Sequence, residues 1–486
     1  MESKAKQKAL VAVDLGAQSC RVSLLRWNSG EPEVRVIHRF SNAPVETTDG
    51  LRWDITGIFQ GIEAGLRLAA KEAPEGVASV AIDGWAVDYV RLRAIGGPVA
   101  DPFCYRDPRT EQAEKEVHAI IPPSRLYSMT GIQILRLNTL YQLYADKLAG
   151  LDTGAQWLNL PEFMSYRLGG KRVSEYTNAT HTGLVALDTH GWCEDIFKET
   201  GLDISAAPEI VASGSIIGEI SGNLASLPEF QETQIIVPAC HDTASAIAAI
   251  PAMGDDCAFI SSGTWSLVGT VLSSPCVSED ARCLNFTNLG GIGGNTYFLK
   301  NVNGTWLLQQ CMDEWERMGH RCSLQELLPA CESLPCPPCL IDVDDPQLML
   351  PGDVLRKINA QLERQGQPRL STDRSGIPSI ANLLFHSLAA RYAEVLISIG
   401  KITGKKLKRL FIVGGGNQNT LLNRLTAERS GLEVILGSTE SSTIGNFAVQ
   451  LATLQGDWRS SSGVSAGAVM KWAEQMISHS LVPSGE

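Results

Sequence analysis

Two short stretches of the chain have the residue types of a phosphate-binding turn. Asp14-Leu-Gly16 follows an apolar run at 10–13, and Ser261-Ser-Gly263-Thr264 follows another at 258–260. A turn that contains glycine exposes backbone N–H groups to phosphate oxygens, and glycine lets the ligand approach closely. An Asp beside such a turn can also orient Mg²⁺, usually through water. Each stretch taken alone is equally compatible with an ordinary turn.

A glycine triplet, Gly414-Gly-Gly416, lies between an apolar run at 410–413 and a helix expected from about Asn419. Glycines at such a place let a flat base and a ribose lie against the backbone, and the start of a helix favours anionic groups. The context of strand, triplet and helix therefore indicates a nucleotide platform more strongly than the triplet alone.

A fourth stretch, His241-Asp242-Thr243, follows a short apolar run at 235–238. A carboxylate at the end of a strand can accept a proton from a bound hydroxyl group, which is the work of a general base. The alternative is that Asp242 only caps the helix that follows, since Asp serves that purpose well.

The elements that must position these stretches follow an α/β pattern. Asp54 can cap a helix whose apolar residues, over 55–69, recur at spacings of three and four. A long amphipathic helix is expected over 380–399, with Gly400 as its end. Strands that alternate with helices over the whole length predict a layered α/β fold. The other expected elements are strands over 10–13, 22–25, 77–82, 235–238, 258–260, 267–271 and 410–413, and helices over 243–250 and from about Asn419.

The turns at Gly16 and Gly263 each join two apolar runs, and they lie about half the chain apart. Two similar hairpins at that distance suggest an internal duplication, and so two related domains that face each other. The alternative is a chance similarity of short stretches. The expected boundary lies near 243–256, which gives domains at 1–243 and 244–486.

Composition places the chain among globular proteins. Its 486 residues suit two or three domains at roughly 150 residues each. Hydrophobic residues make up 44% and charged residues 19%, which excludes a disordered or fibrous chain. The formal net charge of −12 argues against a protein that binds nucleic acid through its phosphates. An anionic ligand would need backbone donors, a few Lys or Arg side chains, or a metal ion.

Several familiar motifs are absent. No G-x-x-x-x-G-K-[ST] occurs, and no G-x-G-x-x-G follows a strand, so neither a P-loop nor a dinucleotide-binding fold is expected. Cys336-Pro-Pro-Cys339, with Cys331 nearby, has a spacing known from zinc sites. No second Cys or His pair stands close by, so we expect a surface loop there instead.

The N-terminus and the cysteines favour the cytoplasm. The apolar residues before Asp14 are too few for a signal peptide, and no apolar run approaches 18 residues. The 12 cysteines are too sparse for a disulfide scaffold, so reduced thiols are expected. Residues 481–486 are expected to form a frayed tail.

Passages along almost the whole chain match a known family. They are residues 11–17, 82–89, 105–107 with 109–110, 138–142, 175–180, 241–245, 261–266, 299–301 with 306–309, 414–422, and 440–443 with 445–446. At these residues the chain resembles the FGGY carbohydrate kinases, and among them most closely the rhamnulokinases. The glycine motifs recur in many ATPases, whereas the passages on the sugar side are much more specific.

The resemblance implies an α/β fold of two duplicated actin-like ATPase (ribonuclease H-like) domains around a central cleft. The implied reaction moves the γ-phosphate of ATP to the 1-hydroxyl of L-rhamnulose, which gives L-rhamnulose 1-phosphate and ADP in L-rhamnose catabolism. The implied cofactors are ATP and Mg²⁺. The implied partners are a ketose and ATP, with no nucleic acid and no membrane, in a monomer or small homo-oligomer.

The resemblance also implies roles for particular residues, because phosphoryl transfer depends mainly on positioning and charge stabilisation. Asp242 matches the general base, and Asp14 is expected to hold Mg²⁺ through water. The matched sugar contacts are Ala86, His241, Asp242, Thr243 and Asn301, and the matched ATP contacts are Ala17, Gln18, Ser19, Cys20, Arg21, Thr264, Gln309 and Gly415.

Four positions depart from the family pattern. Cys20 replaces a glycine of the first hairpin, which would cost about 1 kcal/mol if that position needed a positive φ. Ala86 replaces a glycine near the sugar, and its added methyl group could shift sugar preference by about 1–3 kcal/mol. Glu162 replaces an Asp, and Thr426-Ala-Glu-Arg429 replaces a more usual Ala-Asp stretch.

Three other interpretations stay open at this point. The first is the same chemistry on another ketose, such as L-fuculose or L-xylulose, which Ala86 allows. The second is a silent sugar-binding regulator, which would predict loss of Asp14 or Asp242, and both are present. The third is an actin-like chaperone or polymer ATPase, which would not need the passages on the sugar side.

Overall fold

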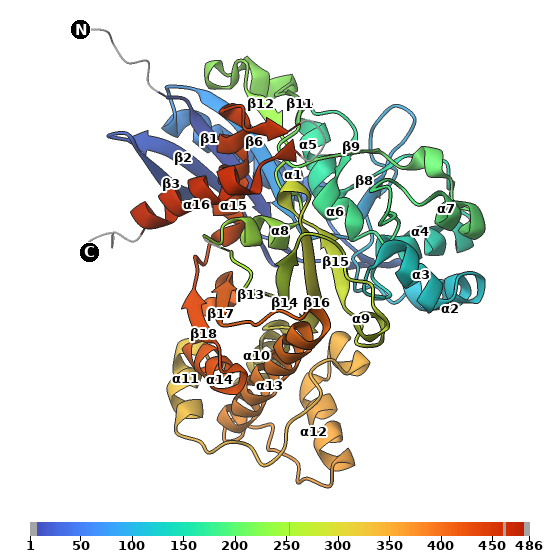
Figure 1. Cartoon of the computed structure of the whole chain (residues 1–486), viewed down its shortest axis with the longest axis vertical. Helices are drawn as coiled ribbons and strands as arrows, with labels where there is room; N and C mark the ends of the chain where they lie inside the picture. Colours follow the sequence, from blue (N-terminus) through green and yellow to red (C-terminus); the bar gives the residue numbers. More distant parts are fainter. Residues whose placement is uncertain (1–6, 252, 460–462, 481–486) are drawn as a thin grey trace. The chain divides into compact units, whose positions relative to one another are not determined.

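The computed structural model describes residues 7–251, 253–459 and 463–480, and Figure 1 shows its elements. The chain packs as two units. The first comprises Met1–Ala252, Leu272–Tyr297 and Glu440–Glu486, and the second comprises Met253–Val271 and Phe298–Thr439. The division into domains at 1–243 and 244–486 stays a prediction, because these units describe packing and not independent folding. The expected frayed tail at 481–486 lies outside the described residues.

The first unit is built on a six-stranded sheet with the order β11-β12-β6-β1-β2-β3. β1 and β2 form the predicted antiparallel hairpin, while β6 runs parallel to β1 and β12 runs parallel to β6. The carboxyl ends of β1, β6 and β12 therefore lie at one edge of the sheet. The strands are β1 (Ala9–Leu15), β2 (Ser19–Asn28), β3 (Glu31–Ser41), β6 (Val77–Gly84), β11 (Ile216–Glu219) and β12 (Gln234–Ile236).

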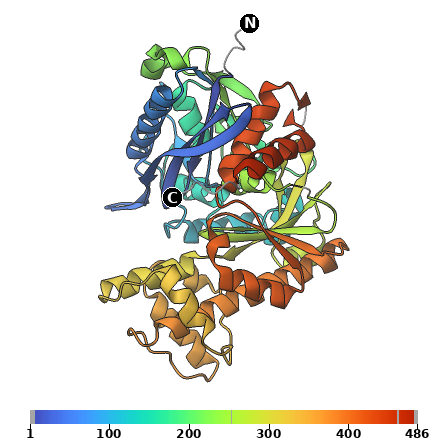
Figure 2. The same cartoon turned by 90° about the vertical axis from the view of Figure 1, so that its left-hand side faces the viewer.

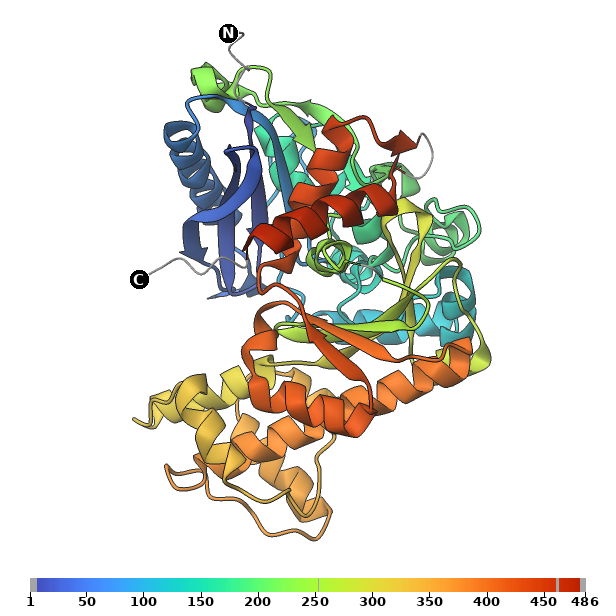
Figure 3. The same ribbon diagram turned by 60° about the vertical axis from the view of Figure 1, so that its left-hand side comes forward.

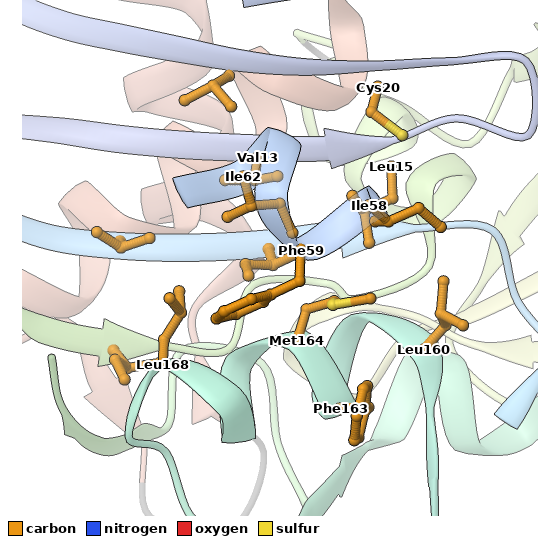
Figure 4. Close-up of a cluster of buried hydrophobic side chains, with 14 of the residues drawn as sticks. Val13, Leu15, Cys20, Ile58, Phe59, Ile62, Leu160, Phe163, Met164 and Leu168 are labelled. Atoms are coloured by element: carbon orange, nitrogen blue, oxygen red, sulfur yellow. The ribbon is translucent and has the colours of Figure 1, made fainter. Parts of the chain in front are cut away.

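Both faces of this sheet are buried along β1, so that strand reads as an unbroken apolar run up to Asp14. Val13 and Leu15 point toward helices α1 (Ile55–Glu72) and α5 (Leu160–Leu168) (Figure 4). Phe59 of α1 and Met164 of α5 lie between the two helices. Helices α15 (Ser441–Leu454) and α16 (Ala466–Ser480) cover the other face, as Figure 3 shows. The sheet is thus a central layer that helices fix on both sides.

Helix α1 begins where its sequence predicts. The Asp54 side chain accepts the Gly57 N–H at 2.8 Å, which is an N-terminal cap. The buried side chains of the helix include Ile55, Ile58, Ile62 and Leu66, at the spacings of three and four expected for one apolar face.

The first unit has a second, smaller core among helices that follow the sheet. Tyr141, Trp157 and Phe197 are among its largest buried side chains. The other helices and strands of this unit are α2 (Thr110–Ile120), α3 (Pro123–Thr130), α4 (Thr139–Leu148), α6 (Tyr176–Thr180), α7 (Glu194–Thr200), α8 (Asp242–Ala248), α9 (Glu279–Cys283), β4 (Val45–Thr47), β5 (Gly50–Arg52), β7 (Tyr89–Arg91), β8 (Trp157–Asn159), β9 (Val173–Glu175), β10 (Glu209–Val211), β15 (Thr287–Gly290), β19 (Trp458–Arg459) and β20 (Gly463–Val464).

The strands of the second unit repeat the pattern of the first. Their order is β16-β14-β13-β17-β18, in which β13 and β14 form the second predicted hairpin and β17 runs parallel to β13. The corresponding order in the first unit is β3-β2-β1-β6-β12, with the same directions around the hairpin. This topology supports the predicted duplication. The strands are β13 (Cys257–Ser262), β14 (Trp265–Leu272), β16 (Thr296–Asn303), β17 (Arg409–Val413) and β18 (Glu433–Leu436).

Helices α13 (Ile377–Thr403) and α14 (Thr420–Ser430) lie along one face of that sheet, and α10 (Trp306–Arg317), α11 (Leu324–Glu332) and α12 (Val354–Arg364) complete the unit (Figure 2). The predicted end of the long helix at Gly400 is wrong. Gly400 costs only about 1 kcal/mol within a helix, whereas Gly404 adopts the left-handed conformation (φ +72°) that ends one.

Among the described residues, only α13 is long and apolar enough by length and composition to cross a membrane. In its most apolar window, 67% of the residues are buried inside the protein. That burial is typical of a core helix. A helix that is apolar on all sides can be buried in the core of a large unit as well as in a membrane.

Candidate active site

Three carboxylates lie at or just after the carboxyl ends of three adjacent parallel strands of the first unit. Asp14 and Asp83 occupy paired positions on β1 and β6, and both are buried. Asp242 comes after β12, where His241 forms an isolated parallel bridge with Gly84 and the Gly84 N–H donates to the Cys240 carbonyl at 2.9 Å. The sheet therefore gathers the three acids at its carboxyl edge, where ligands bind in open α/β sheets.

The first hairpin turn is tight, and Gly16 is required there. A Cβ at Gly16 would lie 2.5 Å from the Ser19 carbonyl oxygen, so no other residue fits without a shift. Asn42 holds the turn from outside. Its backbone N–H donates to the Gln18 carbonyl and its Nδ2 to the Gly16 carbonyl, both at 3.0 Å.

Cys20 is an ordinary strand residue, and its φ is not in the left-handed region. The backbone strain of about 1 kcal/mol that a positive φ would cause at Cys20 is therefore absent. Its side chain lies in the core, and burial raises the pKa of the thiol to about 12. The Cys20 thiol therefore faces the core and is not exposed.

Arg21 brings positive charge to the three acids. Its Nη2 lies 3.0 Å from Asp14 Oδ2, and its Nη1 donates to Glu440 Oε2. Ser442, near the start of α15, also donates its hydroxyl to Asp14 Oδ2. The pKa of Arg21 is raised, mainly by Asp14, so it stays cationic. Arg21 is one of the ATP contacts predicted from the sequence. In the structure its side chain binds the carboxylates of Asp14 and Glu440.

Asp83 carries no role in the sequence analysis, although it follows an apolar strand as Asp14 does. Asn446 Nδ2 donates to Asp83 Oδ2 at 2.6 Å, while the buried Oδ1 has no hydrogen-bond partner. Burial raises the pKa of Asp83 well above its ordinary value, and the charges of Asp14 and Asp242 add to this effect. A buried oxygen without a donor suits a cation or its bound water.

These residues fit Mg²⁺ bound through water. No group of three or more His, Cys, Asp or Glu side chains in 7–251, 253–459 and 463–480 is arranged to hold a metal ion directly. Mg²⁺ usually keeps several of its waters and takes one or two carboxylates together with substrate phosphates. The unpartnered Oδ1 of Asp83, beside Asp14, supplies such a water acceptor.

Asp242 is the first residue of α8, and His241 stands at the N-cap position, so Asp242 is not the cap residue. Its Oδ1 accepts the Thr243 N–H at 2.5 Å and lies 3.3 Å from His241 Nε2. Burial raises the pKa of Asp242 to about 7, and the charge of Asp14 adds to it. Since 34% of its side chain is exposed, Asp242 is an accessible carboxylate with the pKa of a general base.

A buried acid, Glu175, binds the backbone of the loop before Asp242. Glu175 Oε2 accepts the Cys240 N–H at 2.9 Å and the Thr177 hydroxyl at 2.6 Å. Glu162 lies beside it and accepts from the Glu175 N–H at 3.0 Å and from Asn178 Nδ2 at 2.9 Å. Burial raises the pKa of Glu162 to about 8, so this glutamic acid is protonated at neutral pH.

Ala86 lies in a strained turn just beyond β6. The next residue, Val87, has φ +72°, which is unusual for a β-branched residue. Asp88 anchors the turn because its Oδ2 accepts from Trp53 Nε1 at 2.6 Å and from Trp85 Nε1 at 3.0 Å. Backbone strain of this kind persists only where its surroundings enforce it, as they often do at ligand sites.

Two of the predicted ATP contacts, Thr264 and Gln309, lie in the turn of the second hairpin and on the helix bound to that turn. The Gly263 carbonyl accepts from the Thr305 N–H (3.1 Å) and hydroxyl (2.7 Å) at the start of α10, the helix that carries Gln309. Thr264 lies in the turn, and its carbonyl accepts the Trp306 N–H at 3.3 Å. Asn301, a predicted sugar contact, lies on β16 of the same unit.

The glycine triplet packs against the same hairpin. A Cβ at Gly414 would lie 2.7 Å from the Ser262 carbonyl oxygen, and one at Gly416 would lie 2.0 Å from Ser262 Oγ. At Gly415 a Cβ would meet nothing within 4 Å. The outer glycines therefore serve packing, whereas the space beside the Gly415 backbone is open.

Comparison with known proteins places the chain in a family. The model of the FGGY family of carbohydrate kinases matches residues 9–249 with its N-terminal domain and residues 258–454 with its C-terminal domain. A curated rhamnulokinase from Bacteroides thetaiotaomicron is 36% identical over 450 residues, which are 91% of this chain and 90% of that protein.

Solved structures share the fold at low sequence identity. The ligand-bound xylulose kinase from Lactobacillus acidophilus has a TM-score of 0.74 at 16% identity, covering 98% of this chain and 99% of its own. The glycerol kinase of Plasmodium falciparum with ADP has a TM-score of 0.69 at 14% identity, covering 96% and 92%. This agreement confirms the predicted α/β class with two related actin-like ATPase domains. The family models and the curated relative span most of the sequence, and the chain belongs to the FGGY family of carbohydrate kinases, enzymes that phosphorylate sugars.

Proposed function

We propose that this kinase transfers the γ-phosphate of ATP to the 1-hydroxyl of L-rhamnulose, in the cytoplasm and in the breakdown of L-rhamnose. The observation that carries the substrate is the 36% identity to a curated rhamnulokinase over 91% of the chain. Asp242, an accessible carboxylate with a pKa of about 7, supports the chemistry.

In the proposed reaction, Asp242 accepts the proton of the sugar 1-hydroxyl. The hydroxyl oxygen forms the new bond to the γ-phosphorus, and the bond from that phosphorus to the bridging oxygen of ADP breaks. His241 and Thr243 fix the Asp242 carboxylate by their contacts to its Oδ1. A fixed base shortens the search for a reactive geometry, which is a large part of catalysis in phosphoryl transfer.

Charge on the transferring phosphate needs donors that are already in place. The backbone N–H groups of residues 17–21 at the first hairpin are the proposed donors in the first unit, and Thr264, Gln309 and Gly415 are the proposed ATP contacts in the second. Mg²⁺, when bound, would neutralise phosphate charge, and Asp14 with Asp83 would hold it through water.

The proposed sugar contacts are Ala86, Thr243, Asn301 and His241, together with Asp242. The turn at Ala86 is rigid because Asp88 holds Trp53 and Trp85. A rigid wall beside the sugar would make the added methyl group of Ala86 count in the choice of ketose.

The test is coupled ADP release from purified protein with MgATP and L-rhamnulose, L-fuculose or L-xylulose. We expect the highest kcat/KM on L-rhamnulose, and phosphorus NMR of the product should place the phosphate on carbon 1. Faster turnover of another ketose would overturn the substrate and leave the kinase chemistry intact.

The matched pair of variants for the base is Asp242→Asn and Asp203→Asn. Asp203 is an exposed acid that caps a short 3-10 helix, so its loss should leave turnover unchanged. Asp242→Asn should lower kcat by about 100-fold or more, the usual range for loss of a general base. Normal turnover in Asp242→Asn would remove the assigned role of Asp242.

A further inference from the structure

A second histidine contacts the histidine next to Asp242. His181 Nε2 lies 3.0 Å from His241 Nδ1, and His241 Nε2 lies 3.3 Å from Asp242 Oδ1. The two ring centroids are 4.0 Å apart, and both side chains are more than nine-tenths buried. The contacts form one continuous row from His181 to the Asp242 carboxylate.

The backbone holds both histidines in place. The His181 N–H donates to the Asn178 carbonyl, and Asn138 Nδ2 donates to the His181 carbonyl, both at 3.1 Å. His241 follows Cys240, whose N–H is bound by Glu175. Hydrogen bonds therefore fix the backbone from which each of the two rings projects.

Each ring carries a single N–H. Burial lowers the pKa of His181 to about 3 and that of His241 well below its ordinary value, so both are neutral imidazoles. A neutral imidazole has one donor nitrogen and one acceptor nitrogen, and the partner of each nitrogen decides which is which.

An ionised carboxylate only accepts hydrogen bonds, so it requires the His241 proton on Nε2. His241 Nδ1 is then an acceptor, and the hydrogen bond at 3.0 Å requires a proton on His181 Nε2. The order of donors is thus determined along the whole row by the charge at its end.

We propose that His181 is a positioning residue: it donates to His241 Nδ1, fixes the Nε2–H tautomer of His241, and through it orients the Asp242 carboxylate. This inference rests on the proposed function only in the role of Asp242 as the base. The tautomer itself is a property of the folded protein and does not depend on any substrate.

Loss of His181 would leave His241 Nδ1 buried without a donor. A buried polar atom without a partner is costly, so the His241 ring would change its tautomer or its orientation. In either case the Nε2–H contact to Asp242 Oδ1 is weakened, and the base is less well placed to accept the proton.

The direct test is nitrogen NMR of the full chain with all eight histidines labelled with ¹⁵N, at pH 8. The variant His241→Gln assigns the His241 signals by their loss. We expect wild-type His241 to carry its proton on Nε2, and we expect the same in His181→Gln, because a glutamine amide can still donate. A wild-type His241 protonated on Nδ1 overturns the proposal.

The kinetic test compares His181→Leu with His181→Gln and with a control, His118→Leu. His118 Nε2 contacts the Tyr141 hydroxyl at 3.0 Å and belongs to no part of the site. His181→Leu should lower kcat by about 10-fold or more with KM for ATP unchanged, while His181→Gln stays within about threefold of wild type. Full kcat in a folded His181→Leu contradicts a positioning role.

The outcomes separate this inference from the proposed function. If Asp242→Asn stays active while His241 keeps the Nε2–H tautomer, the base assignment fails and the tautomer stands. If Asp242→Asn is inactive but His241 carries its proton on Nδ1, the base stands and the role of His181 falls. Should His181→Leu fail to fold, the wild-type and His181→Gln spectra still decide the tautomer.

Discussion

Asp14 and Asp83 stand level with each other on two neighbouring parallel strands, and both side chains are buried. Arg21 lies within contact distance of Asp14, whereas Asp83 has only the amide of Asn446 on one oxygen. Burial and the charge of the neighbouring Asp14 raise the pKa of Asp83, so a cation bound beside the pair would favour its ionised form. The pair is therefore suited to respond to a divalent ion.

The first prediction concerns Asp83→Asn. The amide keeps the size of the side chain but removes the charge that a bound cation would meet, so the variant should need several times more Mg²⁺ for half-maximal rate. Thermal stability should be unchanged or higher, because a buried acid near Asp14 and Asp242 is unfavourable when ionised. The measurement is rate against free Mg²⁺, with Asp203→Asn as control. An unaltered Mg²⁺ dependence would contradict it.

The second prediction concerns the pH dependence of the rate. Because the pKa of Asp242 is raised to about 7, its carboxylate is ionised above pH 7 and protonated below it. The kcat/KM for the sugar should thus fall about tenfold per pH unit below pH 7 and level off above it. A rate profile between pH 5 and 9 at saturating MgATP tests this. A flat profile down to pH 5 would exclude Asp242 as the titrating base.

The third prediction concerns stability and Glu162. Its pKa is about 8 in the folded chain and 4.5 ordinarily, because burial disfavours the ionised form. Between these values the folded chain keeps a proton that the unfolded chain releases, so this acid makes stability fall as pH rises from 4.5 to 8. Its share is about 1.4 kcal/mol per pH unit.

In Glu162→Gln that share is removed, so the variant should gain stability relative to wild type as the pH rises. Urea unfolding of both proteins at pH 5.5 and 7.5 measures how the free energy of unfolding changes with pH in the variant and in wild type. Glu326→Gln, at an exposed capping box, serves as the control. Equal pH slopes in Glu162→Gln and wild type would show that Glu162 ionises normally.

The fourth prediction separates the three glycines of the triplet. Gly414→Ala and Gly416→Ala would press a methyl group against Ser262, and should cost about 1–3 kcal/mol of stability. Gly415→Ala has open space and should change stability by less than about 0.5 kcal/mol. It should nonetheless raise KM for ATP, if Gly415 faces the nucleotide. The measurements are the melting temperatures and the KM values for ATP of the three variants. A marked loss of stability in Gly415→Ala would contradict the open space at Gly415.

The hairpins, the capped helix at Asp54 and the alternation of strands and helices were predictable from the sequence, because local patterns encode them. The end of α13 was not, since a glycine at 400 and another at 404 look alike in sequence. Only the backbone at Gly404 is left-handed, and tertiary packing carries the helix past Gly400.

The site was predictable in part. The sequence indicates Asp14 and Asp242 as candidates because each lies at the end of a strand, close to a glycine or a histidine. Asp83 also lies at the end of an apolar strand, but a single Asp at such a place is common and does not by itself predict a site. The sequence held no signal for His181, since its meaning depends on its position next to His241 in space, 60 residues away along the chain.

Asp14 accepts a hydrogen bond from Ser442, which follows it by 428 residues. At roughly 5–20 residues per second, a ribosome needs about 20–90 s to make the stretch between them. During that time the sheet of the first unit has emerged, but α15 has not, and Asp83 still lacks Asn446. The kinase can therefore complete its carboxylate site only after α15 has been made, and a nascent chain cut before α15 would lack the contacts of Ser442 and Asn446 to the two acids.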